Sequence, residues 1–306
     1  MLRRERMKIL IAHDGSAGAE SMIEDLKRAG LPRQAEALVL SIAEERIPAP
    51  YSIGGVPTGF RQEELAEVRN ALALARQAQE TVRALFPDWE TRAEAGIGSP
   101  GAEIMARADE WHPDLIIAGS QGRGALGRLI FGSVSQQLVS QARCGVRIAR
   151  GRAVEPADTP VRLIAGIDGS PHAAAAVREI ATRRWPHGGE ITLVSAAWTI
   201  PPVTGSGQAA VVMDWIATEN DRVKKMMDEA AETLRGTGLA VHTLVEEEEP
   251  KRLLLETAGR LRADCIFVGA RGMGRLERIL AGSVSVGVAT RAHCSVEIIP
   301  VEIVHG

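Results

Sequence analysis

Two copies of one glycine pattern are the residues of this chain best suited to bind an anion. The pattern, G-x2-G-x9-G-S, follows an apolar run in each half. Glycine after a strand permits positive φ and lets main-chain N–H groups approach a ligand oxygen. A helical run follows each closing serine, so we expect the serine to cap a helix whose N-terminus attracts negative charge. The copies contain Gly119, Gly122, Gly132 and Ser133, and Gly269, Gly272, Gly282 and Ser283.

This pattern predicts phosphate binding without a P-loop lysine, since no GxxxxGK[ST] motif is present. Arg123 and Arg128 in the first loop, and Arg271 and Arg275 in the second, could offset the charge of a polyphosphate. The alternative is that the glycines form ordinary turns. The first loop also spells G-x-G-x-x-G, but it follows the fourth expected strand and lacks the acidic residue about 20 positions on that a dinucleotide site needs.

A second repeated feature, Asp-Gly-Ser, places one carboxylate after an apolar run in each half. Asp14 and Asp168 could bond to a ribose hydroxyl or to a metal-bound water. The equally plain alternative is a strand-to-helix turn, with Ser170 capping the second of these helices. Backbone groups at Ile42 and Ala196, where the second strands end, would flank an adenine by position alone.

Two further clusters of polar residues are expected to be structural. His13 and Asp14 are adjacent on a strand and point to opposite faces, which argues against a hydrolase triad and favours a packed or solvated histidine. The run Glu246 to Glu249 is expected to be solvated or to complement the helix that begins near Arg252. If these carboxylates faced the ligand they would repel phosphate, which favours the first half for occupancy.

Composition describes a globular protein of two domains. The chain has 306 residues, 45% hydrophobic, 25% charged and 3% aromatic, with 36 basic and 39 acidic side chains. A net charge of −3 gives no positive field for nucleic acid or anionic lipid. Three cysteines without a CxxC pair, and histidines without ligand spacing, favour a reducing compartment and argue against a metal site. No apolar run approaches the ~18 residues of a spanning helix, so we expect a cytoplasmic protein that binds neither nucleic acid nor membranes.

The chain consists of one unit repeated twice. Residues 116–135 align with 266–285 at an offset of 150, and residues 10–16 align with 164–170 at an offset of 154. Between them, the segment 151–160 is polar and contains two prolines, as expected for a linker. We therefore place two domains at residues 1–152 and 160–306.

Short apolar runs alternate with helical periods in both halves. Five strands with crossover helices predict a doubly wound parallel α/β sheet in each half. In the order 3-2-1-4-5, the aspartate and the glycine loop meet where the strand order reverses, which is where such sheets bind ligands. The expected strands are Lys8–His13, Glu36–Ala43, Thr91–Gly96, Asp114–Gly119, Val146–Arg150, Arg162–Asp168, Glu190–Ala197, Ala240–Val245, Asp264–Gly269 and Ser295–Val301, and the expected helices include Glu63–Phe86, Ala173–Arg184, Asp214–Arg235 and Arg252–Leu261.

The repeated Asp-Gly-Ser and the long glycine pattern resemble the universal stress protein family in its tandem form, over nearly the whole chain. The resemblance implies a Rossmann-like fold of the adenine nucleotide α-hydrolase type. Family members with the glycine pattern typically bind ATP, which implies a stress-response protein that holds ATP, or ADP or AMP, with Mg²⁺. By position, the glycines and serines of the pattern would contact phosphates, the two aspartates would lie near the ribose or metal, and Ile42 and Ala196 would lie near adenine.

The resemblance also implies contacts between domains, because family domains pair through their fifth strands. Val146–Arg150 could meet Ser295–Pro300 within one chain, and a homodimer is a further expectation. Two other functions compete with nucleotide binding: a slow ATPase or phosphotransferase, for which Asp14 is the one candidate base, and a nucleotide-free scaffold. We expect a binding protein without catalytic residues, because the sequence shows no positioned general base and no loop lysine.

Overall fold

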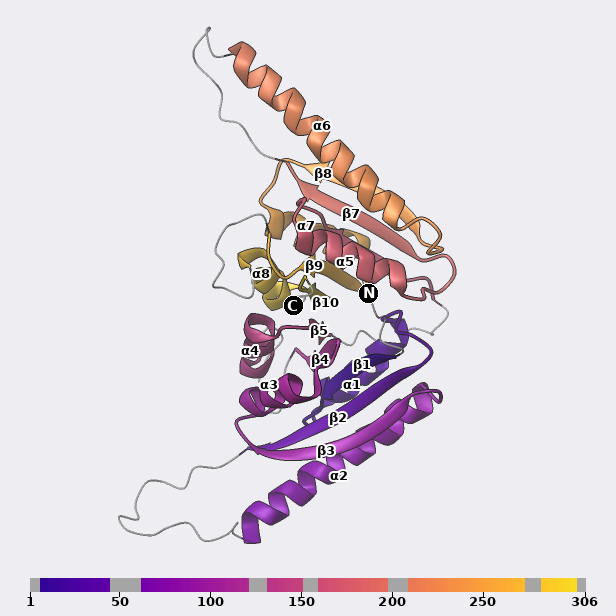
Figure 1. Cartoon of the computed structure of the whole chain (residues 1–306), viewed down its shortest axis with the longest axis vertical. Coiled ribbons are helices and arrows are strands. Elements are labelled where there is room, and N and C mark those ends of the chain that lie inside the picture. The colour runs from indigo at the N-terminus through magenta and orange to yellow at the C-terminus, as the bar shows by residue number, and fades with distance from the viewer. Residues whose placement is uncertain are drawn as a thin grey trace, which may run out of the picture. The chain divides into compact units, whose positions relative to one another are not determined.

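Each half of the chain folds as an α/β unit (Figure 1). The computed structural model describes residues 6–44, 62–120, 131–150, 159–197, 209–272 and 282–301. The chain divides into two compact units: residues 1–27 with 32–151, and residues 28–31 with 152–306. No helix within the described ranges is both long enough and apolar enough to cross a membrane.

The first unit contains a parallel sheet in the order β3-β2-β1-β4-β5, which confirms the predicted doubly wound topology. Its crossovers are helical, and a short 3-10 turn, η1 (Leu26–Arg28), follows the first helix. The elements are β1 (Met7–Ala12), α1 (Ala17–Asp25), β2 (Ala35–Glu44), α2 (Gln62–Leu85), β3 (Glu90–Gly98), α3 (Pro100–Trp111), β4 (Leu115–Gly119), α4 (Ser133–Gln141) and β5 (Gly145–Ala149).

The second unit repeats this order as β8-β7-β6-β9-β10, again with parallel pairing throughout. The repeat found in the sequence is therefore a repeat of the fold. The elements are β6 (Arg162–Gly166), α5 (Pro171–Thr182), β7 (Glu190–Ala196), α6 (Ala209–Thr233), β8 (Ala240–Glu246), α7 (Pro250–Leu261), β9 (Cys265–Gly269), α8 (Ser283–Arg291) and β10 (Ser295–Ile299).

Helices cover both faces of each sheet. In the first unit α1 packs with α2 on one face, and α3 packs with α4 on the other. In the second unit α5 and α6 share one face, and α7 and α8 share the other. The central strands are buried on both faces, which explains why they are continuous apolar runs rather than alternating ones, whereas the edge strands β3 and β8 are partly exposed.

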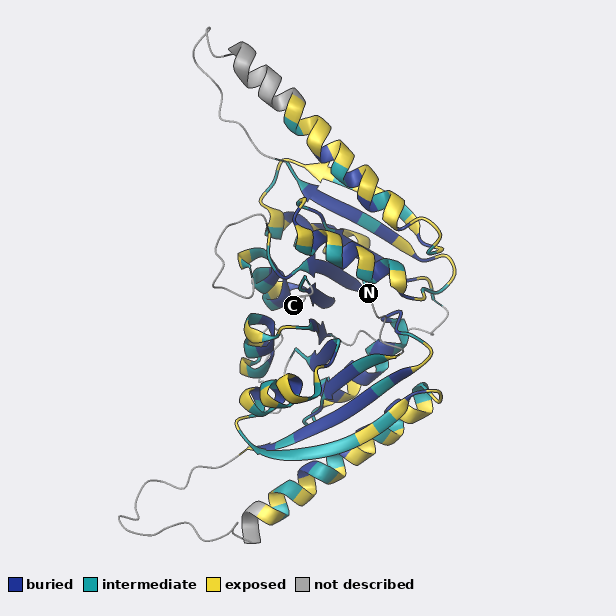
Figure 2. Cartoon of the chain, in the orientation of Figure 1, coloured by how far each residue is buried: buried dark blue, intermediate teal, exposed yellow. Residues whose placement is uncertain are grey.

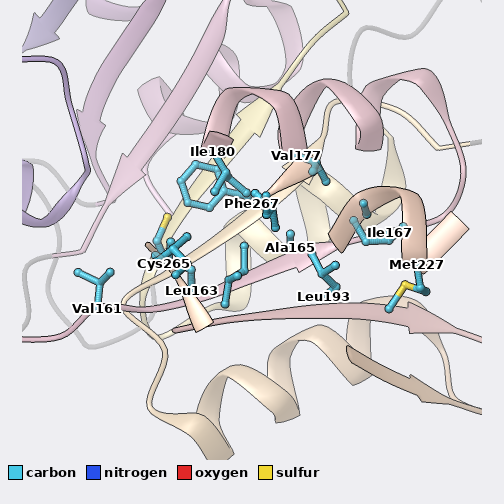
Figure 3. Packing of buried hydrophobic residues seen from close by; sticks show 14 of the residues in the cluster. Val161, Leu163, Ala165, Ile167, Val177, Ile180, Leu193, Met227, Cys265 and Phe267 are labelled. Carbon is cyan, nitrogen blue, oxygen red and sulfur yellow. The ribbon is translucent and has the colours of Figure 1, made fainter. Parts of the chain in front are cut away.

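The core of the second unit lies between its sheet and the helices α5 and α6. Phe267 of β9 is fully buried, and Ile180 and Val177 of α5 pack close to its ring (Figure 3). Leu193 of β7 and Met227 of α6 extend the same cluster. Figure 2 shows the pattern in both units: β2 and β7 are buried over most of their length, whereas the outward sides of α2 and α6 are exposed.

Candidate functional site

The Asp-Gly-Ser segments are tight turns that join β1 to α1 and β6 to α5. The Asp14 Oδ1 atom accepts the Ser16 N–H at 3.0 Å, and Asp168 Oδ1 accepts the Ser170 N–H at 2.9 Å. The glycine inside each turn has positive φ, 74° and 80°. Both serines then cap their helices, so the turn interpretation is confirmed. In each turn the second carboxylate oxygen, Oδ2, is not used by this bond.

The first strand of each unit ends earlier than the sequence predicts. β1 ends at Ala12 and β6 ends at Gly166, two residues before each aspartate. The predicted strands ran to His13 and Asp168, and they are wrong at this end because the aspartate turns the chain before the apolar pattern stops. The carboxylates therefore lie just beyond the carboxyl edge of each sheet.

In the second unit the aspartate turn lies against the glycine loop that follows β9. An ideal Cβ built on Gly272 would be 2.7 Å from the Asp168 Oδ2 atom. The Ser170 hydroxyl also donates to the main-chain carbonyl of Arg271 at 3.2 Å. The structure thus brings Asp168, Arg271 and Gly272 together at the reversal in strand order. The counterparts of Arg271 and Gly272 in the first unit, Gln121 and Gly122, lie outside the described residues, as does Arg123.

The closing glycine of the pattern, rather than its serine, caps the last helix of each unit. The N-cap residues of α4 and α8 are Gly132 and Gly282, whereas Ser133 and Ser283 are already the first helical residues. The prediction that the serines cap is wrong, because the last extended backbone conformation belongs to the glycines, with φ/ψ of −68°/150° and −80°/161°. Neither helix has a side-chain cap.

The N–H groups that remain open at the starts of α4 and α8 belong to the first turns of these helices, not to the closing glycines themselves. The Gly132 N–H donates to the Ser120 carbonyl at 3.0 Å, and the Gly282 N–H donates to the Ala270 carbonyl at 2.6 Å. Both glycine hydrogens are therefore already bonded to protein. The N–H groups of the next three residues in each helix have no bonded acceptor within the described residues.

Only some glycines of the pattern are required by the fold. Among the described residues, no atom would lie closer than 3.6 Å to an ideal Cβ on Gly132 or 3.5 Å to one on Gly282, which is ordinary contact distance. On Gly269 it would lie 2.6 Å from the carbonyl carbon of His172. Close packing of α5 on β9 therefore explains Gly269, whereas packing does not explain the two closing glycines.

We expect Gly269→Ala to lower the free energy of unfolding by about 1–3 kcal/mol, because its methyl group would collide with the backbone of α5. Gly282→Ala should change it by less than about 1 kcal/mol, since a weaker cap and a less flexible unfolded chain oppose each other. Urea unfolding of the two variants measures both effects. Equal effects would contradict the separate roles given to these glycines.

Ile42 and Ala196 lie at the same edge as the aspartate turns. The register of β2 with β1 ends at Leu40, and that of β7 with β6 ends at Val194, so each residue stands two positions beyond the last pair. The Ile42 side chain leans over β3, with its Cδ1 atom 2.8 Å from an ideal Cβ on Gly96. The predicted neighbours of a base are thus placed beside the turns.

An arginine that the sequence analysis missed lies over the aspartate turn of the second unit. The Arg222 Nη1 atom would be 3.1 Å from an ideal Cβ on Gly169. Hydrogen bonding to Glu219 raises the pKa of Arg222, desolvation opposes this, and the charge of Asp168 adds a smaller increase. No short-range pattern signals this residue, because α6 brings it to the turn from a distant part of the chain.

His172, in the first turn of α5, is held in its neutral form. Its Nδ1 atom accepts the Val301 N–H at 3.0 Å, which requires an unprotonated nitrogen. Burial and the nearby Arg271 charge lower the pKa of His172, and Asp168 opposes them. The Arg271 Nε atom is itself buried, with no hydrogen-bond partner among the described residues.

The acidic run and His13 are structural, as the sequence predicts. Glu249 is the N-cap of α7 and accepts the Arg252 N–H at 3.1 Å, and Glu248 lies 3.4 Å from the Arg252 guanidinium. His13 is 3% exposed, with its Nε2 atom 3.5 Å from the Glu20 carboxylate. The sequence analysis favoured the first half for occupancy on the condition that the acidic run faces the ligand. Glu248 and Glu249 are instead engaged at the start of α7, so they do not support that preference.

Comparison with known proteins shows the family to which the chain belongs. The family model of the universal stress protein family matches residues 5–150 and 161–300. The chain is 30% identical over 234 residues to universal stress protein Rv2005c of Mycobacterium tuberculosis, covering 75% of this chain and 74% of that protein. It is 25% identical over 313 residues to universal stress protein Rv1996 of the same organism, covering 96% and 95%.

Solved structures show the same fold. A universal stress protein from Archaeoglobus fulgidus is 19% identical, with a TM-score of 0.61 and 96% coverage of both chains. Two further family structures contain nucleotides, one from Arabidopsis thaliana with AMP bound and one in complex with cAMP. These two cover 47% and 46% of this chain at TM-scores of 0.37 and 0.33, so they carry no conclusion about its ligand.

Proposed function

This chain belongs to the universal stress protein family, with two family domains in tandem, and on that premise we propose that it binds ATP in at least one half. One observation carries the proposal: α4 and α8 each begin at a glycine that the packing does not require and that provides no side-chain cap. A helix start with free N–H groups attracts phosphate, and a missing Cβ lets the phosphate approach.

The surrounding residues support a nucleotide rather than a free phosphate. In the second unit the Asp168 Oδ2 atom, next to Gly272, can accept a ribose hydroxyl. The backbone of Ala196 lies at the same edge, where it can face the base. Asp14 and Ile42 hold the corresponding places in the first unit. Phosphate donors, a hydroxyl acceptor and backbone for a base thus occur in the order that a nucleotide needs.

We propose that Mg²⁺ accompanies the nucleotide instead of occupying a site made by the protein alone. Within the described residues no group of three or more His, Cys, Asp or Glu side chains could hold a metal ion. Mg²⁺ is usually held by one or two carboxylates together with substrate phosphates, and a single aspartate per unit fits that donor set. The ion would supply charge neutralisation for the phosphates.

We propose a binding protein rather than an enzyme. A hydrolase needs a base that is free to take a proton from water. The Oδ1 atoms of Asp14 and Asp168 each accept a serine N–H, which fixes both carboxylates in their turns instead of leaving them free to orient a water. Single-turnover assays with the purified chain should therefore release phosphate no faster than ATP does alone in buffer.

The proposal is tested by identifying what the chain binds. Protein purified without added ligand is denatured and its small molecules are identified by mass spectrometry, and calorimetry then measures ATP binding with and without Mg²⁺. Binding of one or two ATP per chain is the expected result. If mass spectrometry finds no bound nucleotide and calorimetry detects no heat of ATP binding at any accessible concentration, the proposal is contradicted. The nucleotide-free scaffold is then the function that remains.

A further inference from the structure

We infer that Arg222 binds the phosphate chain of the nucleotide in the second unit and makes that unit select a polyphosphate over a monophosphate. The inference rests on the proposed function. Arg222 belongs neither to the glycine pattern nor to the Asp-Gly-Ser repeat. Its placement over the aspartate turn is the observation that carries the inference.

The Arg222 guanidinium is fixed by one carboxylate on its own helix. Its Nε atom donates to Glu219 Oε2 at 2.9 Å, and its Nη2 atom donates to Glu219 Oε1 at 2.6 Å. This bidentate pair uses one edge of the planar group and leaves the Nη1 atom on the other side. The Nη1 atom lies over Gly169, the residue that stands between Asp168 and Ser170 in the turn. Glu219 is thus a positioning residue for Arg222.

Arg222 and Arg271 both lie at the aspartate turn of the second unit. Ser170 ties the main chain of Arg271 to the same turn, at 3.2 Å, and the Arg271 Nε atom lacks a partner within the described residues. Glu219 and Asp168 balance the charges of these two arginines, so what the site offers a ligand is the Arg222 Nη1 atom, which the Glu219 pair leaves unused. Guanidinium groups bind phosphate oxygens through charge-assisted bonds, so each added phosphate increases the attraction.

The first unit lacks both arginines. The buried faces of α2 and α6 repeat with the same spacing, at an offset of 152, which places Asn70 where the second unit has Arg222. Gln121 stands in the sequence where the second unit has Arg271. The matched core positions are Ala71, Ala75, Ala78 and Val82 in α2, and Val223, Met227, Ala230 and Leu234 in α6.

The test compares ATP with AMP at the second site. Calorimetry is carried out on full-length chain that carries Gly132→Val, which removes binding at the first unit, with and without Arg222→Asn. This substitution installs the residue found in the first unit. We expect it to weaken ATP binding about tenfold, as for the loss of one charge-assisted bond, and to weaken AMP binding less than about twofold.

A matched control is Arg235→Asn. Arg235 pairs with Glu232, also three residues apart, but lies two residues beyond the end of α6 at Thr233. It should leave both affinities unchanged, and urea unfolding should show that both variants remain folded. Equal losses for ATP and AMP, or no loss, would overturn the role of Arg222.

The inference and the proposed function fail in different ways. If unmodified chain binds ATP but the Gly132→Val chain binds none, the second unit is not a site, and the inference falls while nucleotide binding stands. If the unmodified chain binds neither nucleotide, both fall.

Discussion

A chain with Gly132→Val and Gly282→Val together is expected to lose at least about a hundredfold in ATP affinity while keeping its fold. Each isopropyl group would occupy the approach to the first turn of α4 or α8. Two charge-assisted hydrogen bonds lost at each helix amount to about 3 kcal/mol or more, which corresponds to this factor. Valine is compatible with the extended backbone of both positions, so the fold should persist. Calorimetry of the double variant measures the loss.

The matched control for this pair is Gly259→Val on α7, a glycine with no atom within 4 Å of an ideal Cβ and no part in the pattern. It should bind ATP as the unmodified chain does. The two single variants then show which unit is occupied. Undiminished affinity in the double variant would disprove the assignment of phosphate binding to these helix starts.

Removing Glu297 is expected to lower the free energy of unfolding by about 3 kcal/mol or more. Glu297 lies in β10 with 0% exposure, and its Oε2 atom accepts from Arg183 Nη1 at 2.9 Å. Glu297→Ala takes this carboxylate from an arginine side chain that is only 3% exposed and stacks near Phe267. Glu179, which also binds Arg183, compensates only in part, since its side chain is 31% exposed.

Urea unfolding of Glu297→Ala checks this value, with Glu256→Ala as its control. Glu256 pairs with Arg252 on the surface of α7, where both side chains are 61% exposed, and such pairs contribute less than about 1 kcal/mol. If the two variants lost similar stability, burial would not be what makes the Glu297 pair strong.

The sequence predicts the fold of each unit well because its signals are local and repeated. Apolar runs such as Glu190–Ala197 and Asp264–Gly269 match β7 and β9 to within one residue. The predicted and observed bounds differ mainly at the ends of the strands. The last strand was predicted to run to Val301 but ends at Ile299, because apolar residues continue after the last ladder pair with β9.

The site was predictable where repeated motifs and the strand order together place its residues. Asp168 and Gly272 come together as the strand order requires. Two other features depend on tertiary placement. Whether Gly282 or Ser283 caps α8 depends on where the backbone leaves its extended conformation. Arg222 reaches the turn because α6 packs beside α5, and no spacing along the chain encodes that contact.

The space that a Cβ would find beside Gly132 and Gly282 has a consequence for the evolution of such a protein. If the chain binds ATP as proposed, a single codon change at either position can silence one half while the fold stays intact, because a Cβ there would meet described neighbours only at ordinary contact distance. Gene duplication followed by drift can in this way turn one copy into a passive partner and leave the other as the sensor. Selection on these two positions therefore reports on ligand use alone, separate from selection for stability.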